Sequence, residues 1–270
     1  MPPVEPSPEA STGLGPSGPS ESPSPSGAAI VIVAAGRGTR AGAADKVFLP
    51  LDGRPILAHV LDAVSQTQCV QGVVLVMGEH TREAAERLAQ TNAWPMSLSI
   101  VNGGARRQDS VAAGVAAVPA EATVVLIHDG ARPLVEPALF DRCAAAAVDV
   151  GAAIAAVPVS DTLKRVESAR VVGTVARESL WAAQTPQAFR RDLLVAALAS
   201  PLAQSHTFTD EAGLFEALGL PVAVVQGSMR NLKVTHPDDL QLAAALLAGG
   251  NPSHDPSVRP AQDPIWSVGR

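Results

Sequence analysis

The sequence predicts an α/β fold in which a mostly parallel sheet carries helices on both faces. Continuous apolar runs, such as AAIVIVA at residues 28–34 and GVVLVM at residues 72–77, are typical of strands buried on both faces. Segments with the apolar spacing of helices alternate with these runs. This alternation indicates parallel strands joined by helical crossovers, an arrangement of the Rossmann-like kind.

The elements of the first half follow from these patterns in order. Apolar residues recur with helical spacing after the first strand and predict a helix at residues 55–65. After the strand at residues 72–77, the polar segment TREAAERLAQ predicts a surface helix at residues 81–90 with Thr81 as its N-cap. A strand at residues 97–101 and a helix at residues 108–118 continue the alternation.

In the second half the rhythm continues and then breaks. TVVLI predicts a strand at residues 123–127, and an Ala-rich helix at 137–149 and a strand at 152–157 follow. Residues 161–166 and 170–175 are short strands of mixed polarity, so we expect a hairpin that forms a protruding arm at about residues 158–178. The domain closes with helices at residues 191–199 and 210–218, a strand at 222–225 and a helix at 238–248.

Two tails flank this single domain of residues 28–248. Residues 1–27 contain 8 Pro, 7 Ser and 4 Gly. A segment of this composition cannot bury enough apolar surface to offset its chain entropy, so we expect it to be disordered. Residues 249–270 are also rich in Pro, Asp and Ser and are expected to form a flexible tail.

Composition excludes several classes of protein. The formal net charge of −6 and the lack of a basic block argue against a nucleic-acid or anionic-membrane partner. There is no uninterrupted apolar run long enough for a transmembrane helix, and no secretory signal is visible. Two cysteines cannot make a disulfide framework, so we expect a cytoplasmic protein.

Ligands of open parallel sheets bind beyond the carboxyl ends of the strands, so the loops there are the candidate sites. The loop after the first strand contains Gly36, Gly38 and the cations Arg37, Arg40 and Lys46. It is not a dinucleotide fingerprint, because its third glycine comes one place late, and it is not a P-loop. Glycines and three cations suit a triphosphate, with a plain turn as the alternative.

Two further loops add to this candidate site. Gly103, Gly104 and two arginines precede a helix N-terminus, which favours anions, although Asp109 and Ser110 are equally compatible with ordinary helix-start residues. Asp129 ends a buried strand and therefore needs a metal or a cation as partner. Beside a triphosphate this metal is Mg²⁺, and the alternative is an ion pair with Arg132.

The last candidate segment precedes the closing helix. Lys233 lies in an apolar, strand-like setting, and Thr235 with Asp238 resembles a capping box. Lysine is rare in this chain and occurs only at Lys46, Lys164 and Lys233. No residue set resembles a Ser-His-Asp or Cys-His nucleophile. Cations, glycines and one or two acids are what nucleotidyl or phosphoryl transfer needs, and we expect His128 to be structural.

Seven blocks in this order closely resemble the 2-C-methyl-D-erythritol 4-phosphate cytidylyltransferase family of the non-mevalonate isoprenoid pathway, from about Ile30 to Leu247. The blocks are Ala34–Arg40 with Lys46, Gly103–Gly104 with Arg107–Ser110, His128–Pro133, Pro158–Lys164, Trp181 with Gln184–Gln187, Thr209–Ala212 and Asn231–Thr235. The resemblance implies a fold of the nucleotide-diphospho-sugar transferase type, with the hairpin as a dimerisation arm and a homodimer as the assembly.

The resemblance also implies the reaction and the site. The phosphate of methylerythritol phosphate attacks the α-phosphorus of CTP directly, with Mg²⁺, and pyrophosphate leaves. Arg40 and Lys46 would stabilise the transition state, and Lys233 would contact phosphates. The nucleotide would lie against Ala34, Ala35, Gly36, Gly38, Gly104, Asp109, Ser110 and Asp129, with Asp129 beside the metal. The acceptor would be held by Arg132, Thr162, Arg177, Thr185 and Lys233.

Three alternatives remain at this point. The sibling ribitol 5-phosphate cytidylyltransferase shares the transfer chemistry and differs in the acceptor. An NAD-dependent oxidoreductase is disfavoured by the late glycine and the missing ribose-binding acid. A non-catalytic nucleotide binder is disfavoured because Arg40, Lys46 and Lys233 are all present. Ala105 departs from the family, which often has a polar residue there.

Overall fold

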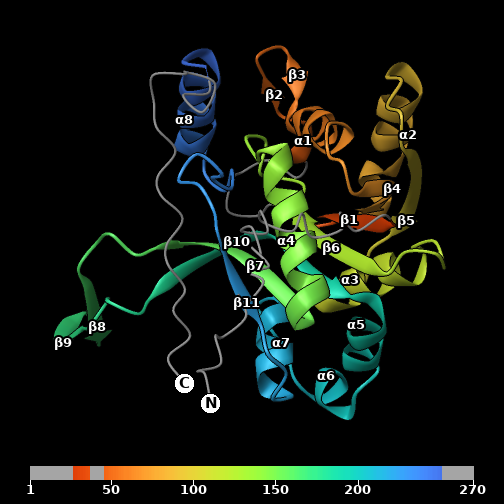
Figure 1. Cartoon of the computed structure of the whole chain (residues 1–270). Coiled ribbons are helices and arrows are strands. Elements are labelled where there is room, and N and C mark those ends of the chain that lie inside the picture. Colours follow the sequence, from red (N-terminus) through yellow and green to blue (C-terminus); the bar gives the residue numbers. More distant parts are fainter. Residues whose placement is uncertain (1–26, 37–45, 251–270) are drawn as a thin grey trace, which may run out of the picture.

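The computed structural model describes residues 27–36 and 46–250, and its centre is one seven-stranded sheet (Figure 1). The strand order is β11-β7-β10-β6-β1-β4-β5. Six strands run in one direction: β1 (Ala28–Ala34), β4 (Val70–Met77), β5 (Ser97–Asn102), β6 (Val124–Asp129), β7 (Ala152–Pro158) and β11 (Ala223–Gln226). The predicted mostly parallel sheet is confirmed.

The seventh strand, β10 (Trp181–Arg190), was not predicted from the sequence. It lies between β6 and β7 and is antiparallel to both. Its sequence contains Pro186, which cannot donate to a ladder and argues against a central strand. The register with β7 shifts between Ala183 and Gln187, so the strand accommodates the proline in an irregular stretch. That stretch brings Thr185 to the end of β6, where its hydroxyl oxygen accepts the N–H of Asp129.

Helices cover both faces of the sheet, as predicted. One face packs against α1 (Ile56–Ser65), α2 (Arg82–Thr91) and α4 (Pro137–Val150). The other packs against α3 (Arg107–Ala116), α5 (Arg191–Leu198), α6 (Pro201–Ser205) and α7 (Glu211–Ala217). Strand β1 shows why both faces are needed, because Ile30 and Ile32 face the first core and Val31 faces the second.

A smaller third core joins the closing helix to the first part of the chain. Here α8 (Pro237–Ala248) contributes Ala243, which packs with Leu51, Ile56 and Val234. Leu51 belongs to a short antiparallel ribbon formed by β2 (Pro50–Leu51) and β3 (Arg54–Pro55). The chain also forms two 3₁₀ turns, η1 (Lys46–Phe48) and η2 (Glu79–Thr81). No helix in the described ranges is long and apolar enough to cross a membrane.

The predicted hairpin is present and stands away from the body (Figure 1). Strands β8 (Leu163–Glu167) and β9 (Arg170–Val175) pair antiparallel through a turn in which Ser168 and Ala169 have φ of 46° and 61°. Val166, Val171 and Val172 are exposed on it. Its contact with a second subunit stays a prediction.

Three local expectations are corrected by the structure. Thr81 precedes α2, but its hydroxyl donates to the carbonyl of Gly78 and does not cap the helix. The capping box of α8 is formed by His236 and Asp239, one residue later than predicted, with Asp239 accepting the His236 N–H at 2.7 Å. Lys233 lies in a loop and not in a strand, and its side chain is 40% exposed. Residues 1–26 and 251–270, where most of both predicted tails falls, lie outside the described residues.

Candidate active site

The carboxyl ends of four parallel strands meet at one edge of the sheet. The register pairs Ala34 with Met77, Met77 with Asn102, and Val33 with Asp129. A cavity of about 580 Å³ opens at this edge. It is lined by Val33, Ala34, Ala35, Gly36, Lys46, Val47, Gly104, Ala105, Arg106, Arg107, Ser110, Asp129, Ala131 and Lys233. Eight of the predicted site residues therefore share one cavity: Ala34, Ala35, Gly36, Lys46, Gly104, Ser110, Asp129 and Lys233.

Other predicted site residues lie elsewhere. Gly38 and Arg40 fall outside the described residues. Thr162 and Arg177 are exposed at the base of the arm and do not line this cavity, and the Arg177 guanidinium donates to the carbonyl of Ser160. Their contact with an acceptor stays a prediction.

One wall of the cavity is the loop between β5 and α3, which approaches β1 very closely. A Cβ on Gly103 would lie 2.4 Å from the Cβ of Ala35 and 2.8 Å from Oγ of Ser110, so only glycine fits. The N–H of Gly104 donates to Oγ of Ser110 at 3.1 Å. The buried Ser110 side chain thus holds the glycine loop through this hydrogen bond, and it also lines the cavity.

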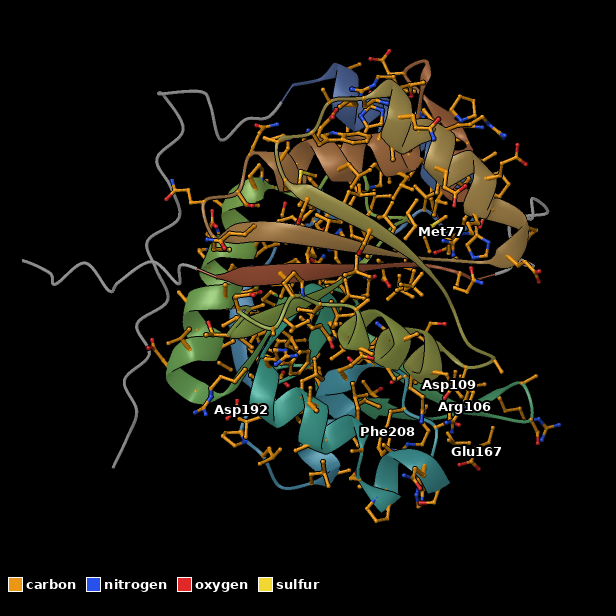
Figure 2. All side chains as sticks on the ribbon, turned by 90° about the vertical axis from the view of Figure 1, so that its right-hand side faces the viewer. Met77, Arg106, Asp109, Glu167, Asp192 and Phe208 are labelled. Atoms are coloured by element: carbon orange, nitrogen blue, oxygen red, sulfur yellow. The ribbon has the colours of Figure 1, made fainter. Side chains whose placement is uncertain are left out.

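Asp109 holds the start of α3. It accepts the N–H of Arg106 at 3.0 Å and the Arg106 guanidinium at 2.6 Å, and Figure 2 shows the two side chains side by side. The hydrogen bonds from Arg106 hold the pKa of Asp109 below its usual range. The helix-start interpretation of Asp109 is what the structure shows, and its contact with a nucleotide stays a prediction.

The opposite wall carries the charge centre of the site, Asp129. Its side chain is 11% exposed and pairs through Oδ2 with Nζ of Lys233 at 2.9 Å and Nε of Arg132 at 3.4 Å. Burial alone would raise the pKa of Asp129, but the charges of Lys233, Arg132 and Arg107 outweigh it and lower the pKa to about 2. Asp129 is therefore a carboxylate at neutral pH, and the pair with Arg132, the alternative to a metal partner, is present.

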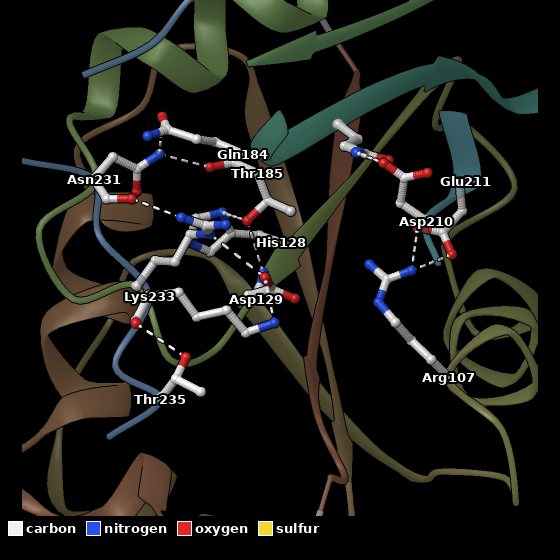
Figure 3. A network of polar contacts seen from close by, with 12 residues as sticks. Arg107, His128, Asp129, Gln184, Thr185, Asp210, Glu211, Asn231, Lys233 and Thr235 are labelled. Atoms are coloured by element: carbon white, nitrogen blue, oxygen red, sulfur yellow. Dashed lines mark hydrogen bonds and ion pairs between the residues drawn. The ribbon is translucent and has the colours of Figure 1, made fainter. Parts of the chain in front are cut away.

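A buried layer beneath Asp129 fixes its position (Figure 3). The Asp129 N–H donates to Oγ1 of Thr185 at 3.1 Å, and the Thr185 hydroxyl lies 3.1 Å from Nδ1 of His128. Burial lowers the pKa of His128 to about 3, so the ring that pairs with the Thr185 hydroxyl is neutral. Thr185 serves Asp129 in this structure, and its predicted contact with the acceptor stays a prediction.

Asn231 ties the Lys233 loop to this layer. Its Nδ2 donates to the carbonyl of Thr185 at 2.8 Å, and its own carbonyl accepts Nη1 of Arg132 at 2.7 Å. Arg132 is nearly buried and points to Asp129 and Asn231. Asn231 was singled out from the sequence only as a member of one of the seven blocks. Nothing in its spacing indicated that it joins the Lys233 loop to Thr185 and Arg132.

Arg107, the first residue of α3, is a lining residue that sequence reasoning did not single out. Its Nη1 donates to both carboxylate oxygens of Glu211, at 2.6 and 2.8 Å (Figure 3). Glu211 is only 2% exposed, and Arg107 is 26% exposed. The sequence showed only a cation at the start of a helix. The acid that pairs with Arg107 lies 104 residues further along the chain, so local sequence does not reveal it.

The donor set for a metal is small. Among the described residues, no three His, Cys, Asp or Glu side chains gather closely enough to bind a metal ion. Mg²⁺ is commonly held by one or two carboxylates together with substrate phosphates. One ionised carboxylate at the wall of a cavity with several cations fits that mode of binding, and Asp129 is the residue that fits.

Comparison with known proteins agrees with the nucleotide-binding chemistry that the geometry of the cavity indicates. The family model for 2-C-methyl-D-erythritol 4-phosphate cytidylyltransferase matches residues 28–249. A relative from Gloeobacter violaceus named 2-C-methyl-D-erythritol 4-phosphate cytidylyltransferase is 48% identical over 221 residues, which is 81% of this chain and 95% of the relative.

Solved structures are also similar. A 2-C-methyl-D-erythritol 4-phosphate cytidylyltransferase from Thermus thermophilus superposes with a TM-score of 0.68 at 35% identity, over 82% of this chain and 99% of that one. A 4-diphosphocytidyl-2C-methyl-D-erythritol synthase from Anaerococcus prevotii gives a TM-score of 0.73 at 29% identity, over 83% and 99% of the two chains.

Proposed function

The chain belongs to the 2-C-methyl-D-erythritol 4-phosphate cytidylyltransferase family, and we propose that the cavity at the carboxyl edge of its sheet is where it performs this reaction. The enzyme transfers a cytidylyl group from CTP to 2-C-methyl-D-erythritol 4-phosphate in isoprenoid precursor biosynthesis, with release of pyrophosphate. The family match favours this acceptor over ribitol 5-phosphate.

The observation that carries the site assignment is the distribution of charge around the cavity. Among the described residues, Lys46, Arg106, Arg107 and Lys233 line it together with a single carboxylate, Asp129. Cations at fixed positions stabilise the negative charge that builds on a transferring phosphoryl group. The cavity of about 580 Å³ falls in the size range of small-molecule sites, and the tight contact between Ala35 and Gly103 fixes two of the segments that line it.

In this mechanism the acceptor phosphate oxygen attacks the α-phosphorus of CTP. The bond to the new oxygen forms as the bond to the bridging oxygen of pyrophosphate breaks, so no covalent enzyme intermediate is needed. Lys46, together with Arg40, neutralises the charge that develops on the α-phosphate. Lys233 contacts phosphate groups from the other wall, where Asn231 and Asp129 hold its loop.

Asp129 is the residue that would hold Mg²⁺. When bound, the ion would neutralise charge on the phosphates of CTP. Nζ of Lys233 lies 2.9 Å from Oδ2 of Asp129, and its positive charge lowers the pKa of Asp129 so that the carboxyl group stays ionised. Arg132, buried behind Asp129, orients the carboxylate from below.

The acceptor, the assembly and the location complete the proposal. Thr162 and Arg177 lie at the base of the arm, outside the cavity of their own chain. We therefore assign them to the acceptor site of a neighbouring subunit in a homodimer whose contact is the arm. The enzyme would act in the cytoplasm, and it needs neither nucleic acid nor a membrane as partner.

Steady-state turnover of CTP and methylerythritol phosphate tests the assignment. Lys46→Ala should lower kcat by on the order of 10²-fold or more, the scale of losing one oriented charge stabiliser. Lys46→Arg should also be poor, because a planar guanidinium does not replace a compact ammonium. Arg87→Ala, which removes an exposed cation of α2 paired with Glu83, is the control and should leave kcat unchanged. Near-normal turnover of Lys46→Ala would contradict the assignment.

Acceptor specificity needs its own measurement. We expect kcat/KM for methylerythritol phosphate to exceed that for ribitol 5-phosphate at saturating CTP. Preferred use of ribitol 5-phosphate would overturn this part of the proposal and leave the CTP site intact.

A further inference from the structure

Glu211 is a buried charge that the mechanism above does not use. It is the first residue of α7, only 2% exposed, and its carboxylate is held by Nη1 of Arg107. A buried ion pair is weak evidence for stability, because well-packed apolar residues often serve as well. The place of this pair in the molecule therefore calls for a different explanation.

The pair has one buried end and one end in the cavity. Arg107 lines the cavity and keeps 26% of its side chain exposed. Within the described part of the chain, both of its side-chain hydrogen bonds leave from Nη1. Figure 3 shows the rest of the guanidinium turned away from Glu211, on the side where Asp129 lies. Nε and Nη2 form a planar fork of donors that matches paired acceptors on a ligand.

Asp129 competes for the same guanidinium. Its charge contributes to the electrostatic environment of Arg107, and it already pairs with Lys233 and Arg132. An arginine side chain without Glu211 would be drawn across the cavity toward this carboxylate. Glu211 thus keeps Arg107 on its own wall and leaves the space between the two walls open.

Glu211 is itself fixed by the central sheet. The carboxylate of Asp210 caps α7 by accepting the N–H of Gly213 at 3.0 Å. Gln187 of β10 donates to that carboxylate at 2.8 Å and accepts the N–H of Ala212 at 3.3 Å. The start of α7 is therefore tied to a central strand on both sides of Glu211, as a positioning residue requires.

We propose that Glu211 is a positioning residue that holds Arg107 with its Nε and Nη2 donors directed at paired acceptors of bound CTP. This inference rests on the proposed function, since it assumes that CTP occupies the cavity. The acceptors are either phosphate oxygens or O2 and N3 of cytosine, and both accept two parallel N–H donors in the same way.

The test compares Glu211→Gln with Glu216→Gln, which removes the same charge from the exposed side of the same helix. Glu211→Gln should raise KM for CTP about tenfold, the scale of one charge-assisted hydrogen bond, while KM for methylerythritol phosphate stays within about twofold. Glu216→Gln should change neither. Thermal unfolding of both variants establishes that the assays are made on folded protein.

A double variant separates positioning from general destabilisation. If Glu211 acts through Arg107, Arg107→Lys combined with Glu211→Gln should bind CTP no more weakly than Arg107→Lys alone. Additive losses in the double variant would overturn the proposal, as would a folded Glu211→Gln enzyme with unchanged KM for CTP. A wild-type enzyme inactive with CTP would instead overturn the proposed function.

Calorimetric titration identifies the acceptors on CTP. If the fork contacts phosphates, cytidine should bind wild type and Glu211→Gln equally, because it carries no phosphate. If it contacts cytosine, the difference should persist with cytidine and disappear with UTP, whose N3 carries a hydrogen. Either pattern supports the positioning role, and no difference for CTP, cytidine or UTP overturns it.

Discussion

Replacing Gly103 by alanine is the most direct test of how tightly the cavity wall is built. The new Cβ would lie 2.4 Å from Cβ of Ala35, whereas ordinary contacts begin at 3.4 Å. The β5–α3 loop must therefore move away from β1 by about 1 Å. A displacement of about 1 Å at a positioning group can cost on the order of 10²-fold in rate. We expect kcat/KM for CTP to fall by this order, and overpacking to destabilise the fold by roughly 1–3 kcal/mol.

A second substitution makes this prediction specific. In the Gly103→Ala protein, Ala35→Gly removes the methyl group responsible for the closest contact, and only the 2.8 Å contact with Oγ of Ser110 remains. Steady-state kinetics should then recover by about tenfold, with Ala35→Gly alone as the control. Kinetics of Gly103→Ala within about threefold of wild type would refute the reasoning, and so would a double variant no better than Gly103→Ala.

Three further predictions concern other parts of the chain. The pKa of His128 is lowered to about 3 by burial, so the unfolded chain takes up a proton first as the pH falls below about 6.5, and stability is lost in that direction. Between about pH 7.5 and about pH 5 this loss should amount to about 2 kcal/mol in urea unfolding, and His128→Asn should remove it; an unchanged pH dependence in the variant would exclude His128 as the cause. Burial raises the pKa of the Cys143 thiol to about 12, so iodoacetamide at about pH 8 should modify Cys143 only in urea, and rapid labelling of native protein would contradict its buried position. Deleting residues 1–25 should leave turnover unchanged, because the described residues that line the cavity begin at Val33; a loss of folding would show that this segment is part of the domain.

Most regular elements could be predicted because burial on both faces leaves a strong signal. Strand β1 begins and ends where the apolar run does, and the hairpin strands were visible as an interruption of the rhythm. Strand β10 could not be found in this way. Its stretch around Pro186 contains polar side chains that are satisfied by distant residues such as Asn231, and local sequence does not show those partners.

The candidate site was predictable in the same measure. The rule that ligands bind at the carboxyl ends of parallel strands brought Asp129, Gly104 and Lys46 to one edge, and the structure places them around one cavity. Pairs such as Arg107 with Glu211 could not be inferred, because no periodicity relates residues 104 positions apart. The role of Asp109 at the helix start was one of two open interpretations, and geometry was needed to see it.

The reversed direction of β10 has a consequence for how this family can vary. Strand β7 ends at Pro158 and β10 begins at Trp181, and these two residues are paired at the cavity edge of the sheet. The chain leaves the core and returns to it at neighbouring points, so a change in the length of the segment between them need not move a core strand. A parallel return would have needed a crossover helix to the far edge. The arm is therefore a part of the chain whose length can change at little cost to folding of the core.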